Sequence, residues 1–152
     1  MLPERQRSLQ SRTTAISARW EALLRIEPVN SPLANPDALA HLIAQSQKQV
    51  FTLLAKPARA PVSVAAAKAC VPNCECGHNP YLAYFLAGEQ ALVEAMVLLE
   101  AELSVGERRQ SDVAEVMLAV RRCARLEIDT FCGACAHRCL DAKCRHRPTG
   151  IE

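Results

Sequence analysis

Two short segments of the chain are rich in residues that bind metal ions. The first, CVPNCECGHNP at residues 70–80, contains three cysteines and one histidine within nine positions. The second, FCGACAHRCLDAKCRHR at residues 131–147, contains four cysteines and two histidines. Cysteine thiolates and imidazole nitrogens are ligands of zinc, and thiolates also hold iron–sulfur clusters. If the fold brings the two segments together, they can form one metal site.

The spacing within the segments predicts which residues bind the metal. Cys132 and Cys135 form a C-x2-C pair that can present two thiolates to one ion, and Cys74 and Cys76 can supply two more. These four cysteines are the primary predicted ligands of a tetrahedral site, with zinc preferred and an iron–sulfur cluster as the second candidate. The secondary candidates, as alternatives or as ligands of a second ion, are Cys70, His78, His137, Cys139, Cys144 and His146.

The expected compartment bears on how the cysteines are used. The N-terminal segment MLPERQRSLQSRTT is polar, and no run of about 18 apolar residues is present, so we expect a cytoplasmic protein. In a reducing compartment, the eight cysteines are better suited to metal binding or redox chemistry than to permanent disulfides. Disulfides, or a metal-free thiol switch in which neighbouring arginines and lysines lower the thiol pKa, remain alternatives.

Composition predicts a single all-α domain. The chain has 152 residues, of which 50% are hydrophobic and only 4% aromatic, and alanine and leucine are abundant. This composition favours helices over a sheet. The 18 basic and 16 acidic residues are interspersed and give a net charge of +2, so the chain lacks the basic patch of a nucleic-acid-binding protein. We expect neither nucleic acid nor membrane as a partner, which leaves another protein as the partner class.

Local signals predict four long helices. An apolar stripe through Leu9, Ile16 and Trp20 predicts a helix over residues 3–27. The dipeptide Asn-Pro, which suits the first positions of a helix, opens predicted helices at residues 36–56 and again at residue 80.

The last helix is expected to follow a short polar turn at residues 104–111, with Ser111 as its cap. Short joints between long helices are typical of an antiparallel four-helix bundle. The predicted units are an N-terminal helical hairpin (1–56), a cysteine-containing connection (57–79), a C-terminal helical hairpin (80–131) and a cysteine-rich basic tail (132–152).

This topology brings the two cysteine segments together. Because antiparallel helices climb at the same rise per residue, residue 80 should lie opposite residue 135, within about one turn. Both segments then lie at one end of the C-terminal hairpin, and we expect the 36–56 helix to end nearby. The convergence predicts a metal centre with a structural or a redox- or metal-sensing regulatory role.

The remaining chemistry favours no other function class. Cys123 falls on the apolar stripe of the last helix and is predicted to pack in the core. The carboxylates of Glu89, Glu94 and Glu100 lack the Glu-x-x-His pairs of di-iron bundles, so we expect them on a solvated face. Outside the cysteine segments, the sequence has no acid–base pair at a spacing diagnostic of catalysis, so we do not expect an enzyme. The alternative function is a helical adaptor or interaction module whose cysteines form a thiol switch or disulfides.

Overall fold

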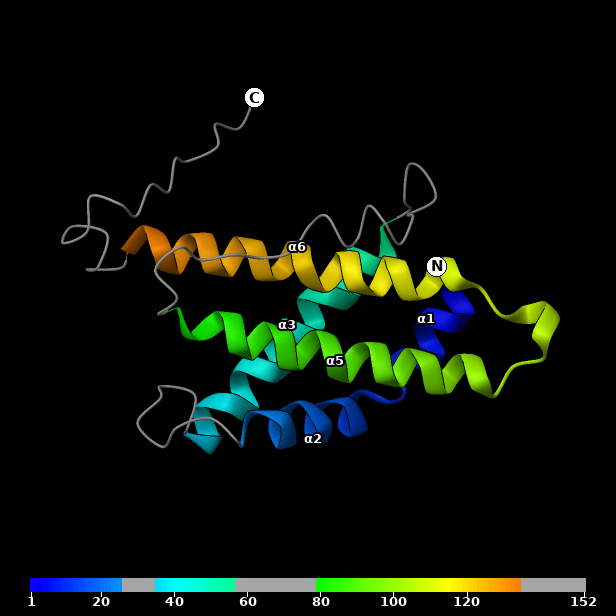
Figure 1. Ribbon diagram of the computed structural model, residues 1–152, viewed down its shortest axis with the longest axis horizontal. Helices are drawn as coiled ribbons and strands as arrows, with labels where there is room; N and C mark the ends of the chain where they lie inside the picture. Colours follow the sequence, from blue (N-terminus) through cyan, green and yellow to red (C-terminus); the bar gives the residue numbers. More distant parts are fainter. Residues whose placement is uncertain (26–34, 57–78, 135–152) are drawn as a thin grey trace, which may run out of the picture.

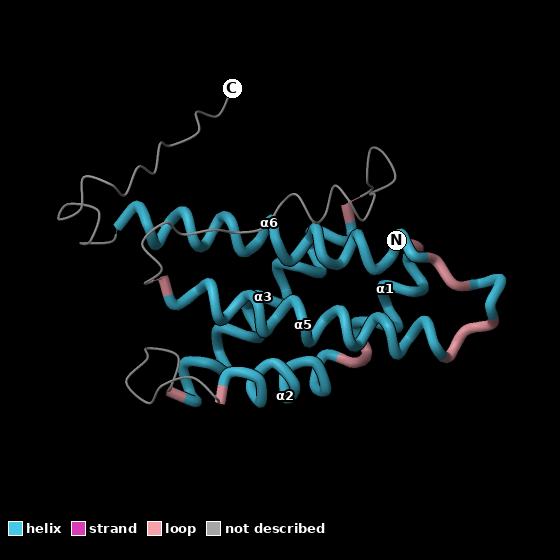
Figure 2. Tube along the Cα trace, viewed as in Figure 1, coloured by secondary structure: helices cyan, strands magenta, loops and turns pink. Residues whose placement is uncertain are grey.

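The computed structural model describes residues 1–25, 35–56 and 79–134, and these residues form helices and short turns with no strand among them. The helices are α1 (Pro3–Gln10), α2 (Thr13–Leu24), α3 (Pro36–Ala55), α5 (Pro80–Ala101) and α6 (Gln110–Ala134), with the short 3-10 helix η2 (Val105–Glu107) between the last two. The predicted all-α class is confirmed for this part of the chain (Figure 2).

The predicted helix over residues 3–27 is in fact two helices. The chain turns at Ser11 and Arg12, and the described helix ends at Leu24. At this break, the Ser8 hydroxyl donates to the carbonyl of Glu4 and the Ser11 hydroxyl donates to the carbonyl of Ser8. Serine side chains that bond nearby backbone carbonyls weaken a helix, which explains why the apolar stripe alone was a poor guide to continuity here.

Both Asn-Pro openings start helices as predicted. The Asn35 side chain accepts hydrogen bonds from the amides of Asp37 and Ala38 at 3.0 and 3.3 Å, and Pro36 begins α3. The Asn79 side chain accepts from the amide of Tyr81 at 2.9 Å, and Pro80 begins α5. The side chains satisfy amides that have no partner within the helix.

The start of α6 differs from the prediction. The helix begins at Gln110, so Ser111 lies in its first turn and the prediction that Ser111 caps it is wrong. A capping box does occur nearby, but it opens η2, where Ser104 and Glu107 exchange hydrogen bonds. The polar connection thus forms an ordered 3-10 turn between α5 and α6.

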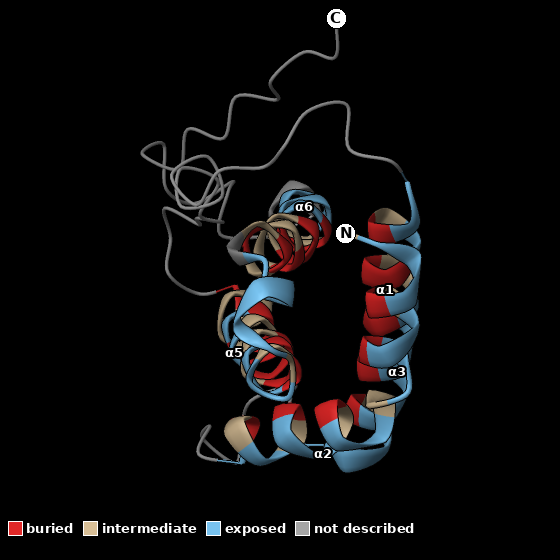
Figure 3. Cartoon of the chain, turned by 90° about the vertical axis from the view of Figure 1, so that its right-hand side faces the viewer, coloured by how far each residue is buried: buried red, intermediate tan, exposed pale blue. Residues whose placement is uncertain are grey.

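The helices enclose one hydrophobic core. In the end-on view, α5 and α6 lie together on one side, α3 and α1 lie on the other, and α2 lies across the space between them at the bottom (Figure 3). Buried faces of all five helices point towards the interior. The largest side chains with almost no exposed surface are Trp20, Tyr84, Leu9, Ile16, Leu92, Met96 and Ile128.

Trp20 joins α2 to α5 at the centre of this core. Its indole nitrogen donates to the carbonyl of Tyr84 at 2.8 Å, and the two rings lie 4.9 Å apart between centroids. Gly88 lies directly under the indole ring, since a side chain there would meet the ring. Trp20, Tyr84 and Phe85 are all buried in this core.

Candidate metal centre

The structure describes only one of the ten predicted ligand residues, and that one through its backbone. Cys132 lies in the last turn of α6. The other predicted ligands lie outside the described residues: Cys70, Cys74, Cys76, His78, Cys135, His137, Cys139, Cys144 and His146. Within the described part of the chain, no three histidine, cysteine, aspartate or glutamate side chains are grouped so that they could hold a metal ion.

The described residues do fix where the two cysteine segments join the helices. The start of α5 lies beside the end of α6, at one end of the molecule (Figure 1). The amide group of the Asn79 side chain donates to the carbonyl of Ile128 at 3.3 Å, and Asn79 is only 4% exposed. The rings of Tyr81 and Phe131 meet edge to face with their centroids 5.8 Å apart. The two helices of the α5–α6 hairpin therefore stay in contact as far as the residues next to the two cysteine segments.

The register of the hairpin is close to the predicted one. The ring contact sets residue 81 opposite residue 131, about one turn closer to the connection than the predicted pairing of residue 80 with residue 135. The predicted register assumed that the first helix of the hairpin ends at residue 103 and that the second begins at residue 112. The connection instead occupies residues 102–109, including η2, and this shifts the pairing.

The end of α3 is not where the sequence predicted it. Phe51, near that end, accepts a hydrogen bond through its carbonyl from the Gln6 side chain of α1 at 3.1 Å. In turn, Arg5 of α1 contacts residues that border the α5–α6 connection. The prediction that this helix ends nearby is wrong: α3 ends away from the start of α5 and the end of α6, and it is inclined to both helices (Figure 1). The 23-residue connection of residues 57–79 is far longer than a short helix–helix joint, so it does not require α3 and α5 to be antiparallel neighbours.

Cys123 is a core residue, as predicted. Its side chain is 3% exposed, it forms no disulfide, and its sulfur lies 3.0 Å from the Gln49 side-chain oxygen. Burial, assisted by the nearby negative charge of Glu127, raises the pKa of the Cys123 thiol to about 12. A protonated, buried thiol is a poor metal ligand and a poor nucleophile.

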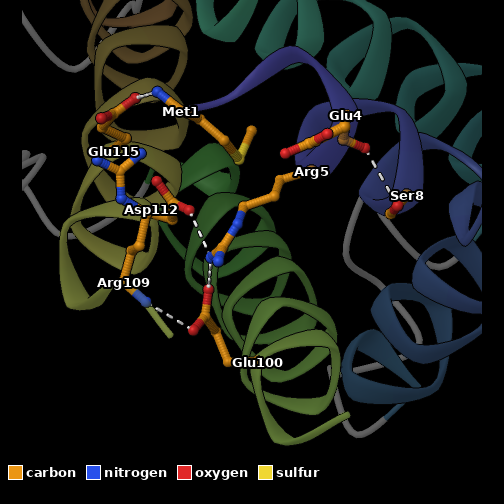
Figure 4. Close-up of polar contacts among 8 residues, drawn as sticks. All are labelled: Met1, Glu4, Arg5, Ser8, Glu100, Arg109, Asp112 and Glu115. Carbon is orange, nitrogen blue, oxygen red and sulfur yellow. Dashed lines mark hydrogen bonds and ion pairs between the residues drawn. The ribbon is translucent and has the colours of Figure 1, made fainter. Parts of the chain in front are cut away.

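Charged residues form a cluster at the opposite end of the hairpin. The guanidinium of Arg5 donates to Asp112 at 2.9 Å and also contacts Glu100, so it joins α1 to both helices (Figure 4). The amide of Arg109 donates to Glu100 at 2.8 Å, and the amino group of Met1 pairs with Glu115. Asp112 is 1% exposed, so the cluster is largely shielded from solvent.

These ion pairs correct the prediction of a solvated carboxylate face for Glu89 and Glu100, whereas Glu94, whose side chain is 39% exposed, does lie on a solvated face. Glu100 pairs with Arg5, and Glu89 forms two hydrogen bonds with Arg121 across the α5–α6 interface. Glu94 pairs with Arg19 of α2, and this ion pair lowers the pKa of Glu94 to about 2. The partners are separated by 32 to 95 positions in the chain, so no local pattern could have revealed them.

The most apolar helix has the length and composition of a membrane-spanning segment. By length and composition, α5 is the one helix in the described ranges that could cross a membrane, with a mean hydropathy of 1.5 over an 18-residue window. About 44% of that window is buried by the rest of the protein, and a core helix passes the same test. The hydropathy of α5 is therefore compatible both with a membrane-spanning helix and with a core helix.

Comparison with known proteins adds no assignment: no protein-family model, no curated protein and no solved structure matches the chain.

Proposed function

We propose that the chain is a cytoplasmic helical-bundle protein that binds a metal at the end where α5 begins and α6 ends. Zinc is the preferred metal and an iron–sulfur cluster the second, and the role is structural or a redox- or metal-sensing regulatory one. The proposed primary ligands are Cys74, Cys76, Cys132 and Cys135. The observation that supports the proposal best is the contact of Asn79 with Ile128. It brings the end of the first cysteine segment beside the helical turn that leads into the second.

The covalent chain limits how far the first pair of ligands can lie from this contact. Consecutive Cα atoms are 3.8 Å apart, so the Cα of Cys76 lies at most about 11 Å from that of Asn79. Cys135 directly follows the last residue of α6. Zinc–sulfur bonds of about 2.3 Å set thiolates about 3.8 Å apart in a tetrahedral site, and chain segments of these lengths can meet that requirement.

The donor set favours a soft metal. Four thiolates match the tetrahedral coordination of zinc and the ligation of iron–sulfur clusters, whereas magnesium and calcium need oxygen ligands. The basic residues of the second segment, Arg138, Lys143, Arg145 and Arg147, would lower the pKa of neighbouring thiols and so favour the metal-binding thiolate form.

A thiolate site at this end would couple the metal to the structure. Binding would fasten the segment before α5 to the end of α6 and contribute to folding free energy. Oxidation of the thiolates would release the metal and loosen that end of the hairpin. A partner protein that recognises one of the two states would complete a sensor.

The first test is the metal content of protein purified anaerobically without chelator, with a visible spectrum of the same sample. We expect one zinc per chain or more and no colour; iron with visible absorbance would indicate a cluster instead. Cys132→Ser and Cys135→Ser should lower both metal content and melting temperature. Cys123→Ala is the matched control: it removes a buried core thiol and should lower the melting temperature alone.

Other outcomes would overturn the proposal. Neither zinc nor iron in the wild-type protein, with all eight thiols titrating after denaturation, would leave the helical adaptor with a metal-free thiol switch; fewer than eight titrating thiols would point to disulfides instead. Unchanged metal content in both Cys132→Ser and Cys135→Ser would remove the proposed primary ligand set.

A further inference from the structure

The two Asn-Pro helix starts share a sequence but differ in their surroundings. Asn35 and Asn79 both accept hydrogen bonds from backbone amides in the first turn of the helix that follows. Asn35 is exposed, whereas Asn79 is 4% exposed and its side-chain nitrogen also bonds the carbonyl of Ile128. The side chain of Asn79 therefore makes a contact with α6 that capping of α5 does not require.

The bond to Ile128 ends on the turn that carries Cys132. In an α-helix the carbonyl of residue i accepts the amide of residue i+4, so the carbonyl of residue 128 belongs to the same hydrogen-bonded turn as the amide of residue 132. The backbone of Asn79 meanwhile continues directly from His78. One buried side chain thus connects the root of the first cysteine segment to the turn that carries a cysteine of the second.

We propose that Asn79 is the positioning residue of the metal site. It holds the turn of Cys132 close to the chain that enters α5, and this limits how far apart ligands of the two segments can lie before metal binds. This inference rests on the proposed metal-binding function and names a residue that touches no metal. The edge-to-face contact of Tyr81 with Phe131, one turn away, supports the same register.

The expected effect follows from preorganisation. A site whose ligands are held in place loses less conformational freedom when the metal binds than one whose segments must first be brought together. A typical hydrogen bond contributes about 1 kcal/mol, so its loss should weaken metal binding about fivefold. The change should appear in the affinity itself, because the ligands are unaltered.

Two substitutions separate positioning from capping. Asn79→Asp keeps an oxygen that accepts from the amide of Tyr81, but it replaces the donor to Ile128 with a second oxygen. Asn79→Ser keeps a capping oxygen, introduces no charge and is too short to bridge the helices. Asn35→Asp is the matched control, since it makes the same change at an exposed cap with no described bond to another helix.

The experiment measures zinc affinity by competition with a chromophoric chelator, and the melting temperatures of the metal-free and zinc-loaded full-length proteins. Both Asn79 variants should bind zinc about fivefold more weakly, and zinc should raise their melting temperatures less than it raises that of the wild type. Asn35→Asp should bind zinc as the wild type does.

Two results would overturn the inference, and they are distinct. Suppose that the Asn79 variants bind zinc with wild-type affinity and that the substitutions lower the melting temperatures of the metal-free and zinc-loaded proteins equally. Asn79 is then only a structural cap, and the metal site stands without it. If the wild-type protein itself binds no zinc, the proposed function fails, and this is seen before any variant is made.

Discussion

Replacing Gly88 with alanine tests the packing of α2 on α5. A β-carbon at residue 88 would stand no more than 2.5 Å from three atoms of the Trp20 ring, where carbon atoms normally keep about 3.5–4.0 Å. The ring cannot easily retreat, because Trp20 is fully buried, its nitrogen bonds the carbonyl of Tyr84, and the Phe85 ring lies 6.5 Å away between centroids. The helices must therefore separate or the indole must leave its rotamer.

The expected loss is the difference between two opposing effects. Overpacking a filled core costs about 1–3 kcal/mol, and a rigid indole held by a hydrogen bond favours the upper value. Alanine in place of glycine within a helix returns about 1 kcal/mol. The free energy of unfolding should then fall by about 2 kcal/mol, which lowers the melting temperature by about 4–8 °C in a chain of this length.

The assay is urea denaturation followed by the fluorescence of the single tryptophan, which reports on the ring in question. Gly106→Ala is the control, since a β-carbon at Gly106 would meet nothing within 4 Å. It should leave the unfolding midpoint unchanged or raise it slightly. A Gly88→Ala protein as stable as Gly106→Ala, with an unchanged emission maximum, would refute the close approach of α2 to α5.

Two further predictions concern ion pairs. Arg5→Met should lower the free energy of unfolding by about 3–5 kcal/mol, because Asp112, which is 1% exposed, loses its guanidinium partner, whereas Arg25→Met, at a 75% exposed side chain, should change it by less than about 0.5 kcal/mol. Urea midpoints would compare them, and equal effects would contradict the buried cluster. The pKa of Glu94 is lowered to about 2 beside Arg19. A carboxyl group with a lower pKa in the folded state stabilises it fully above its unfolded-state pKa of about 4.3, and this contribution disappears as the pH falls towards 2. The difference in melting temperature between wild type and Glu94→Gln should therefore shrink between pH 5 and pH 2; a constant difference would show that the pair is not formed in solution.

Helix positions were predictable where the signal is local. Asparagine followed by proline supplies both a cap and a preset backbone angle, so α3 and α5 begin where the sequence indicated. The break between α1 and α2 was missed because an apolar stripe continues across it, from Leu9 to Ile16, while the serines that weaken the helix are polar residues outside the stripe. Periodicity reports which face is buried and is insensitive to a two-residue turn.

Helix directions and partners were predictable only for short joints. The α5–α6 hairpin has a connection of eight residues, and its register was close to the predicted one. The long connection of residues 57–79 permits either relative direction of α3 and α5, so the course of α3 could not be derived. Arg5 likewise meets its carboxylates 95 and 107 positions away, and no rule of spacing links residues so distant. For the candidate site, the sequence predicted that Cys123 packs in the core and that the start of α5 lies beside the end of α6. The hydrogen bond from Asn79 to Ile128 depends on tertiary packing and was not predicted.

The described contacts at the two ends of the α5–α6 hairpin differ in strength, and this bears on what a metal would do. At the connection, Arg5 bridges Glu100 and Asp112 through charge-assisted hydrogen bonds, which are about twice as strong as neutral ones. At the other end, Asn79 donates a 3.3 Å neutral hydrogen bond to Ile128, and the Tyr81 ring packs on those of Phe131, Tyr84 and Phe85. Cooperative units of a protein open separately when their stabilities differ, so we propose that loss of a metal bound at this end would loosen the chain there while the ion cluster holds the connection together. A local change of this kind would suit the proposed sensing role.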